Sequence, residues 1–461
     1  MKNNNVSRRN FLKTTGLGAV GVIAAPLVVP SSVFGAGAPG NRINIGVIGC
    51  GRIARDHDMP GVWQDDNVRI IGVCEVDNKR LHDAKKHVSE FYAKKLGSAY
   101  NDVQTYDNYL EMLENKDIDA VIISTPDHQH AKQTIDSVYA GKDVYLQKPT
   151  SLTVSEGRVM SNAVNSTGRI FQIGSQQRSM TQFRVACELV RNGRIGQLQT
   201  IEVRLPGDPA GGNTAEMPVP PNLNYDAWLG PTPWVHYTLD RVHPQHDYSR
   251  PGWLRLEQFG AGMITGWGTH HFDIAHWAMG TEYTGPIEIS ATAEFPAAGS
   301  GLWDVHGKFH SEMLYANGVR VLGMEDSAEK PNGVLFTGSE GWIFVSRGSY
   351  TASASDPAMA APSRALQASD PKVLEWKPGA NDIHFEHSAD HHLNWLAAVR
   401  ARKQAITNAE IAHRSCSACL LQHIAMKLPR KLHWDPIRER FNNDDEANAM
   451  LTRVQRYPYN I

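Results

Sequence analysis

At 461 residues the chain is long enough for two domains and a targeting segment, because single hydrophobic cores stop growing near ~250–300 residues. Apolar residues make up 41% and charged residues 20%, and the formal net charge is −2. This near-neutral charge does not indicate a basic surface, so we do not expect nucleic acid as a partner. The five cysteines are odd in number and scattered, which argues against a disulfide framework.

Residues 1–40 have the pattern of a targeting segment and are not expected to be part of the fold. A basic stretch with Arg8 and Arg9 is followed by an apolar run over 16–29, too short and too rich in Gly and Pro for a transmembrane helix. The segment resembles a twin-arginine signal, with cleavage expected near Ala36 or Ala38. No lipobox cysteine follows. The resemblance implies a periplasmic protein without a stable membrane anchor.

From residue 41 onward, short apolar runs alternate with amphipathic stretches. The runs 43–49, 68–74, 120–125 and 143–147 predict a parallel sheet covered by helices on both faces, which is a Rossmann-type α/β fold. We assign 41–168 to this dinucleotide-binding domain and 169–461 to a substrate domain. At the boundary, the strand 170–174 completes the nucleotide-binding fold.

A glycine-rich turn separates the first predicted strand from the helix after it. Its first glycine permits a tight turn, its second lets the backbone approach a pyrophosphate, and the final small residue allows close helix–strand packing. The turn reads Gly49, Cys50, Gly51, Arg52, Ile53, Ala54.

Glu75 ends the second apolar run, where a carboxylate accepts hydrogen bonds from the adenosine ribose and repels a 2′-phosphate. We therefore predict NAD rather than NADP. Asp77 is a neighbouring candidate for the ribose contact, and Lys79 and Arg80 are basic residues that soften the preference.

Two further segments follow predicted strands. Thr125-Pro126-Asp127 begins a helix, with Asp127 as the expected N-cap and His130 in a structural role. Lys148 comes at the end of the fourth run, after Gln147, at the edge where open α/β sheets bind ligands.

Together these motifs resemble, in order and spacing, the glucose-fructose oxidoreductase / inositol dehydrogenase / MocA (Gfo/Idh/MocA) family. The resemblance covers roughly residues 42–461. It implies that Lys148 lies next to the nicotinamide and the substrate hydroxyl, where the family has a Glu-Lys-Pro motif. Gln147 replaces the usual glutamate. The expected cofactor contacts beyond the glycine turn and Glu75 are Thr125, Pro126, His130, Gln147, Lys148 and Gln176.

The second domain reads as α+β with a mostly antiparallel open sheet, because alternating strands follow one another over 197–205, 286–296, 306–315, 319–325 and 333–347. Helical periodicity returns over 384–402 and 408–428, and an irregular tail follows Trp434. In the family, such a sheet often mediates oligomerisation and the C-terminal helices brace the nucleotide domain. A homodimer or homotetramer is thus implied.

A long segment over 206–257 is rich in Pro, Gly and aromatic residues, which favours a functional loop over a disordered one. We hypothesise that Trp234 stacks on a sugar, with packing against the core as the equal alternative for each aromatic: Tyr225, Trp228, Trp234, Tyr237, Tyr248 and Trp253. His243 and His246 are exposed-loop candidates. Arg178 is interpreted equally as a contact to a sugar hydroxyl or the cofactor and as part of a structural ion pair.

The stretch 260–273 is similar to the family's glycine-rich segment that ends in Asp-x-x-x-His. His270 aligns with the histidine that takes the hydroxyl proton, a role that suits imidazole. Gly266 occupies the aspartate position, so we expect Thr265 or Asp273 to orient His270 instead. A metal site of His270, Asp273 and His276 is disfavoured, because their spacing spreads them around a helix.

The sequence therefore predicts an exported NAD-dependent dehydrogenase of sugars or glycosides, with Lys148 and His270 as catalytic residues, a tightly bound cofactor that is recycled, and oxidation at C3 favoured over C1. Two alternatives stay open. One is a glycosidase that acts through transient oxidation and elimination. The other is a non-catalytic saccharide-binding protein, which the residues at positions 147 and 266 suggest.

Overall fold

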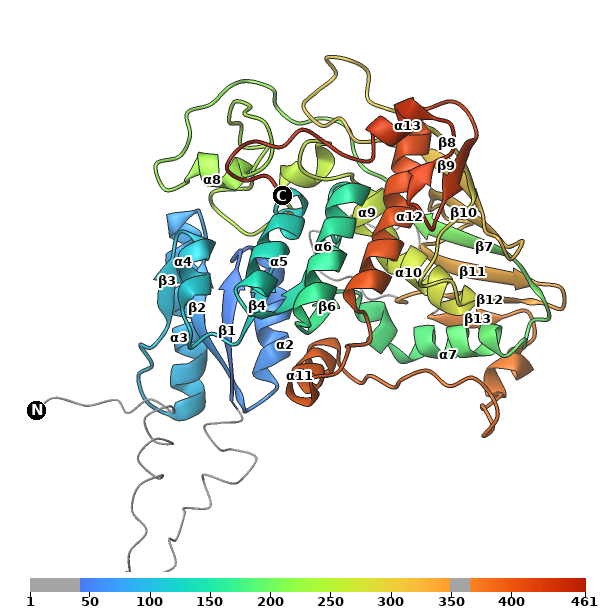
Figure 1. Cartoon of the computed structure of the whole chain (residues 1–461), viewed down its shortest axis with the longest axis horizontal. Helices are drawn as coiled ribbons and strands as arrows, with labels where there is room; N and C mark the ends of the chain where they lie inside the picture. The colour runs from blue at the N-terminus through green and yellow to red at the C-terminus, as the bar shows by residue number, and fades with distance from the viewer. Residues whose placement is uncertain (1–41, 349–364) are drawn as a thin grey trace, which may run out of the picture. The chain divides into compact units, whose positions relative to one another are not determined.

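The computed structural model describes residues 42–348 and 365–461, and its first sheet is wholly parallel (Figure 1). The strands run in the order β3-β2-β1-β4-β5-β6. Their bounds are β1 Ile43–Ile48, β2 Val68–Cys74, β3 Gln104–Tyr106, β4 Ala120–Ile123, β5 Asp143–Leu146 and β6 Phe171–Ile173. This is the strand order of a Rossmann fold, so the predicted fold of the first domain is confirmed.

The helices of this domain begin and end where local chemistry favours it. The side chain of Asp77 caps α3 by accepting from the backbone nitrogens of Lys79 and Arg80, and a capping box of Thr153 and Glu156 starts α6. The elements are η3 Ala54–Asp58, α2 Met59–Trp63, α3 Asn78–Leu96, α4 Tyr109–Glu114, η4 Asp127–Gln129, α5 His130–Tyr139 and α6 Val154–Thr167.

The second sheet is antiparallel at every pairing except that of β7 with β10. This confirms the predicted mostly antiparallel sheet. Its order is β13-β12-β11-β7-β10-β9-β8-β14-β15. The strands are β7 Leu198–Leu205, β8 Glu288–Ala293, β9 Phe309–Leu314, β10 Arg320–Glu325, β11 Gly333–Gly338, β12 Trp342–Val345, β13 Leu366–Ala368, β14 Leu432–Asp435 and β15 Arg440–Phe441.

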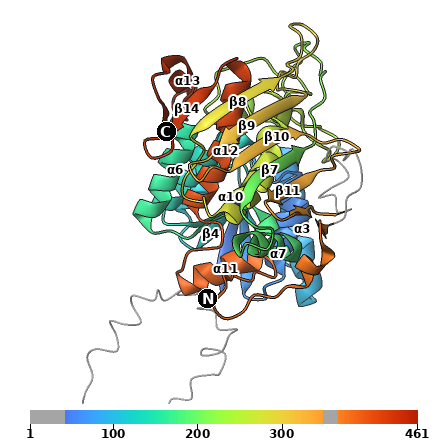
Figure 2. The same ribbon diagram turned by 90° about the vertical axis from the view of Figure 1, so that its right-hand side faces the viewer.

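Two buried helices lie between the sheets, α10 (Gly268–Met279) and α12 (Ala409–Lys427) (Figure 1). They contact each other, and α12 also contacts α6 and β6 of the first domain as well as β8 of the second sheet. The other face of the second sheet is turned away from the first domain (Figure 2). The C-terminal helices therefore brace the nucleotide-binding domain, as the resemblance implied. The remaining elements are η5 Gln176–Ser179, α7 Thr181–Arg191, α8 Tyr225–Leu229, η6 Gly252–Arg255, α9 Met263–Gly266, η7 Pro371–Glu375, α11 His391–Ala401 and α13 Asp445–Ala449.

The structure departs from the sequence expectations in three short elements. β3, β14 and β15 have two to four residues each, and β14 and β15 lie where an irregular tail was expected. So short a strand carries little periodic signal and is defined by the neighbour with which it pairs. β6 pairs with β5, so the first sheet extends past the assigned boundary at residue 168.

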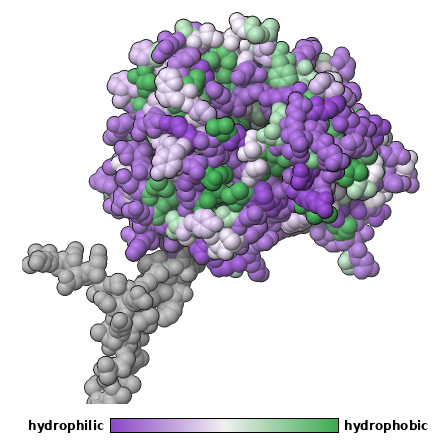
Figure 3. Space-filling model, turned by 45° about the horizontal axis from the view of Figure 1, so that its top comes forward, coloured by the Kyte–Doolittle hydropathy of each residue, from purple (hydrophilic) through white to green (hydrophobic). Residues whose placement is uncertain are grey.

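The long segment 206–257 has a small core of its own, formed by buried residues that include Tyr225, Trp228, Tyr237 and Phe259. Three of the predicted aromatics thus pin the segment to the protein. The surface on this side is mostly hydrophilic, with apolar residues in separate patches (Figure 3).

The signal-like residues 1–40 lie outside the described part of the chain, so the prediction of twin-arginine export stays a prediction. Within residues 42–348 and 365–461, no helix combines the length and the apolar character that a membrane crossing requires.

Candidate active site

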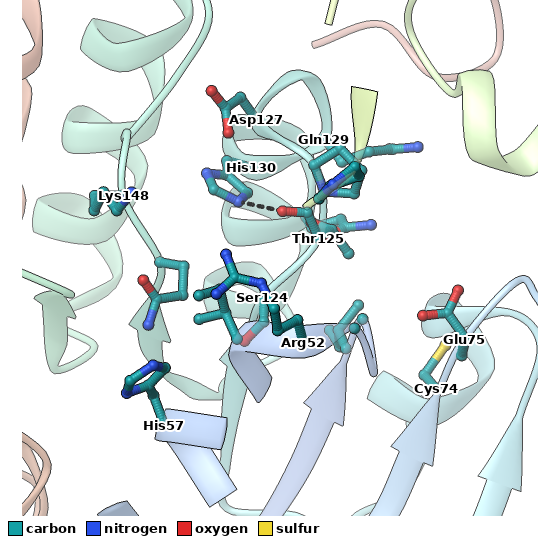
Figure 4. A pocket seen from close by; sticks show the side chains of 18 of the residues that line it. Arg52, His57, Cys74, Glu75, Ser124, Thr125, Asp127, Gln129, His130 and Lys148 are labelled. Carbon is teal, nitrogen blue, oxygen red and sulfur yellow. Dashed lines mark hydrogen bonds between the residues drawn. The ribbon is translucent and has the colours of Figure 1, made fainter. Parts of the chain in front are cut away.

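A pocket of about 1220 Å³ lies along the carboxyl ends of the first sheet. Glu75 at the end of β2, Thr125 after β4 and Lys148 after β5 all line it, and Figure 4 shows Glu75 and Lys148 at opposite sides of this region. The pocket also reaches His270 on α10. It therefore joins the glycine-rich turn to both predicted catalytic residues.

The glycine-rich turn leaves room for a phosphate group. Gly49 has a φ of +83°, and a Cβ on it would lie 2.8 Å from the backbone nitrogen of Thr125. A Cβ on Gly51 would meet only a guanidinium nitrogen of Arg80, at 3.6 Å, so its backbone is open to a ligand. Arg52 and Ile53 line the pocket, whereas Ala54 is fully buried beneath it. This geometry fits the pyrophosphate of a dinucleotide.

Backbone amides hold the carboxylate of Glu75 at the edge of the pocket. Its Oε2 accepts from the nitrogen of Cys50 at 2.9 Å, and its Oε1 accepts from those of Val76 and Asp77 at 2.8 and 3.2 Å. A carboxylate has further lone pairs with which to accept ribose hydroxyls. Its negative charge opposes a 2′-phosphate, in agreement with the predicted choice of NAD.

Asp77 does not line the pocket. Its carboxylate is 1% exposed and accepts from Nε2 of His243 at 2.9 Å and from Nδ2 of Asn222 at 2.8 Å. Burial acts to raise its pKa, but these hydrogen bonds outweigh it and lower the pKa to about 2. The expectation that His243 is an exposed loop residue is therefore wrong, since His243 is buried against Asp77.

Lys79 and Arg80, the two basic residues after Asp77, donate hydrogen bonds to backbone carbonyls of the segment 206–257. Nζ of Lys79 donates to the carbonyl of Gln245 at 2.7 Å, and Arg80 donates to the carbonyls of Pro244 and Asp247 at 2.9 and 3.2 Å. Lys79 is thereby held outside the pocket, whereas Arg80 still lines it beside the glycine-rich turn.

Lys148 and His130 are fixed by backbone carbonyl groups. Nζ of Lys148 donates to the carbonyl of Gly266 at 2.8 Å. The ring nitrogens of His130 lie 2.8 Å from the carbonyl of Thr125 and 2.5 Å from that of Pro149, and Figure 4 shows the first of these contacts. Burial lowers the pKa of His130 to about 4. A neutral ring has one N–H, so His130 donates to one of these two carbonyls and packs against the other, which is the structural role expected for it.

His270 is 5% exposed, and its Nδ1 has no hydrogen-bond partner among the described residues. Burial, followed by the positive charges of Arg347 and Lys148, holds its pKa well below the usual range. The ring is therefore neutral at physiological pH. A neutral imidazole has one nitrogen that can accept a proton.

Neither residue expected to orient His270 does so. The hydroxyl of Thr265 donates to the carbonyl of Gly262 at 3.3 Å, and the carboxylate of Asp273 is bound by Arg178 and Ser415. The rings of His270 and Trp267 instead form a T-shaped pair, with a centroid distance of 6.2 Å. Packing, rather than a carboxylate, orients this histidine.

Arg178 forms the structural ion pair and does not line the pocket. Its guanidinium, 2% exposed, donates to both carboxylate oxygens of Asp273 at 2.7 and 2.8 Å and to Glu282 at 2.8 Å. The reading of Arg178 as a sugar contact is therefore wrong. Trp234 is 68% exposed and lies outside the pocket, so stacking on a bound sugar is not available to it there.

The remaining predicted contacts are in the pocket. Pro126, Gln147 and Gln176 line it, and Nε2 of Gln176 donates to the hydroxyl of Tyr145 at 3.4 Å. Among the aromatic residues of the long segment, Trp228 and Trp253 also line it. Nε2 of His276 lies 2.7 Å from the hydroxyl of Tyr315.

The sequence reasoning missed Asp127 and Arg347. Asp127 was expected to cap a helix, but its side chain makes no capping hydrogen bond, is 4% exposed and lines the pocket. Burial raises its pKa to about 8, although Lys148 and Arg250 oppose the rise. The position of Asp127 after β4 was an available signal. Arg347 follows β12, far along the chain, and no local pattern marks it.

Two family models match the chain. The model described as "Oxidoreductase family, NAD-binding Rossmann fold" matches residues 43–175. The model described as "Oxidoreductase family, C-terminal alpha/beta domain" matches residues 210–372 and 382–461. Both belong to Gfo/Idh/MocA, and together they span most of the chain. The first domain is therefore an NAD-binding Rossmann domain.

Individual relatives are more distant. The chain is 23% identical over 244 residues to the uncharacterized oxidoreductase YrbE of Bacillus subtilis, which covers 53% of this chain and 55% of that protein. It is 28% identical over 207 residues to a glycosyl hydrolase family 109 protein of Shewanella pealeana. This match covers 42% of this chain and 44% of that protein. The chain thus spans about half the length of these curated relatives.

Among solved structures, the WlbA dehydrogenase from Bordetella pertussis, in complex with NADH and UDP-GlcNAcA, has the same fold. Its TM-score is 0.59 at 15% sequence identity, and the match covers 86% of this chain and 99% of that one.

Proposed function

The chain belongs to the Gfo/Idh/MocA oxidoreductase family, and from this premise we propose that it reversibly oxidises a pyranose hydroxyl of a sugar or glycoside with NAD. We favour the C3 hydroxyl, which gives a 3-keto-glycoside. The observation that carries the proposal is that Lys148 and His270 line one pocket with the glycine-rich turn. A relative named as a glycosyl hydrolase and a solved structure with a bound nucleotide sugar support a saccharide as substrate.

Oxidation of an alcohol requires the removal of a proton from oxygen and of a hydride from carbon. Gly49, Gly51 and Glu75 would hold NAD, which would supply the acceptor for the hydride. The ammonium of Lys148, fixed by the carbonyl of Gly266, donates to the hydroxyl oxygen and stabilises the negative charge that develops there.

The proton passes from the hydroxyl to the imidazole of His270, whose neutral ring is ready to accept it. Burial and the charges of Arg347 and Lys148 lower the pKa of His270, so the protonated ring that forms releases its proton to water in the pocket. In the reverse direction, the same ring returns the proton to the carbonyl oxygen.

We further propose that the protein works in the periplasm after twin-arginine export, as a homodimer or homotetramer. Free nicotinamide cofactor is scarce outside the cytoplasm, so NAD would stay bound and be reset by a second substrate in a ping-pong cycle. The twin-arginine pair Arg8 and Arg9 supports export, and the outward face of the second sheet provides a surface for assembly.

A second candidate is a glycosidase that works through transient oxidation. Oxidation at C3 acidifies the C2 hydrogen, its removal expels the group at C1, and addition of water and return of the hydride complete the cycle with no net change in NAD. The named glycosyl hydrolase relative favours this reading. Asp127 lines the pocket, and burial raises its pKa to about 8, which makes its carboxyl a suitable proton donor to the departing oxygen.

The test is the anaerobic nicotinamide absorbance of the natively purified protein, recorded before and after methyl glycosides and free sugars are added, with product analysis. Reduction of the cofactor together with a keto-sugar product is expected. Cleavage without net reduction would favour the glycosidase. Absence of bound cofactor, of NAD binding and of any absorbance change would reject both and favour a saccharide-binding protein.

A further inference from the structure

A buried carboxylate lies behind the wall of the pocket. Asp58, in η3, is fully buried and receives three hydrogen bonds. Oγ of Ser124 donates at 2.6 Å, Nε2 of Gln147 at 2.6 Å, and Nε2 of His392 lies at 3.1 Å. Burying a carboxylate is costly unless such donors surround it, and these three come from segments far apart in the chain. The fold has therefore assembled a site for a negative charge here.

The charge fixes the orientation of Gln147. An ionised carboxylate only accepts hydrogen bonds, so the amide nitrogen of Gln147 must face Asp58 and its oxygen must face the other way. That oxygen points towards Gly174, where a Cβ would lie 3.0 Å from it. Gln147 lines the pocket, whereas Asp58 does not. The negative charge is thus one side chain away from the pocket.

His392 is held in the same way. A Cβ on Gly61 would lie 2.2 Å from Nδ1 of His392, so only glycine leaves room for this ring beside α2. The ring also stacks on Tyr145, with centroids 4.5 Å apart. Nε2 of His392 lies 3.1 Å from Oδ1 of Asp58, so the ring adds a third contact to this carboxylate.

The fold indicates which part of the cofactor faces this charge. In a Rossmann domain the adenosine lies at the residue after β2 and the pyrophosphate at the glycine-rich turn. The nicotinamide therefore lies on the far side of the turn from Glu75, where Gln147 and Lys148 line the pocket. The oxidised ring carries a positive charge that the reduced ring lacks.

We propose that Asp58, acting through Gln147, sets the relative affinity of this protein for the oxidised and reduced cofactor by stabilising the charged, oxidised ring. Asp58 is a positioning residue and does not contact the reacting atoms. The inference depends on NAD binding alone, so it holds whether or not the substrate is a sugar.

The proposal is tested by equilibrating the protein with mixtures of NAD⁺ and NADH and quantifying the two forms that it retains, with no substrate present. For Asp58→Asn, which keeps the size of the side chain, we expect the preference for NAD⁺ over NADH to fall about fivefold, the scale of one charge at short range in a protein. Thermal unfolding confirms that each variant is folded.

Two further variants make the test independent of the stability of Asp58→Asn. Gln147→Glu keeps Asp58 and adds a carboxylate closer to the pocket, so at alkaline pH, where the pair loses its shared proton, it should shift the ratio towards NAD⁺. The exchange variant Asp58→Asn/Gln147→Glu should return the ratio to near the native value.

Asp143→Asn is the matched control. Asp143 is 4% exposed at the start of β5, accepts from the nitrogen of Ile170, pairs with Arg402 and lies outside the pocket, so its replacement should leave the ratio unchanged. Equal changes in both affinities on replacing Asp58, or a Gln147→Glu ratio that moves towards NADH, would overturn the proposal.

Discussion

The side-chain nitrogen of Lys148 lies 2.8 Å from the carbonyl oxygen of Gly266, which links the end of β5 to the segment just before α10. The backbone oxygen of Gly266 thus accepts the hydrogen bond of Lys148, at a position where the family resemblance led us to expect an aspartate. A carbonyl has no net charge, so it holds the ammonium without neutralising it, whereas the nearby carboxyl of Asp127 also interacts with Lys148. Lys148 is therefore held in place without an aspartate at position 266.

Replacing Lys148 should separate chemistry from cofactor binding. For Lys148→Met we expect kcat to fall by about 10²–10⁴, the usual range for loss of such a group, with the affinity for NADH nearly unchanged. Lys132→Met is the control, since Lys132 also lines the pocket but is paired with Asp136. Steady-state kinetics and NADH titration measure both quantities, and native kcat in Lys148→Met would refute the role.

Replacing the two glycines of the turn should affect different properties, namely NAD affinity for Gly51 and stability for Gly49. For Gly51→Ala we expect native stability but at least about tenfold weaker NAD binding, because its Cβ would occupy the space of the pyrophosphate. Gly49→Ala should lose about 1–3 kcal/mol of unfolding free energy, since its φ is +83° and its Cβ would meet Thr125. Chemical denaturation and NAD titration distinguish the two. Native NAD affinity in Gly51→Ala would contradict the placement.

Arg178 should matter for stability and not for substrate binding. Arg178→Met leaves Asp273 buried without its cation, so we expect a loss of about 3–5 kcal/mol of unfolding free energy. In the double variant Arg178→Met/Asp273→Leu, part of this loss should be recovered. KM of the folded enzyme should be unchanged. A raised KM with native stability would instead restore Arg178 as a substrate contact.

The carboxyl of Asp127 should make the free energy of unfolding depend on pH. Burial raises its pKa from 3.8 to about 8, so the folded protein binds this proton more tightly than the unfolded chain does. Its contribution to stability is present below pH 3.8 and is lost as the pH rises towards 8. Relative to Asp127→Asn, the native protein should lose up to about 1.4 kcal/mol for each pH unit in this window. Denaturation at several pH values tests this, and a constant difference would contradict it.

The sequence by itself determined the two-domain fold and the cofactor. Gly49, Gly51 and Glu75 are recognisable because each has a fixed place relative to a strand end, and a strand end can be read from a local run of apolar residues. Lys148 follows the same logic. The ends of parallel strands meet at one edge, so these residues lie together without further information.

The tertiary structure decided which partner each polar side chain takes. Side-chain hydrogen bonds join Arg178 to Asp273, Asp77 to His243, and Gln147 to Asp58. The partners are 89 to 166 residues apart in the chain, so no local sequence pattern predicts these pairs. Position 147 was read as the loss of a family carboxylate, but the fold supplies one from Asp58 in its place. Such pairings depend on which buried groups are brought within hydrogen-bond distance, and only the packing of distant segments fixes that.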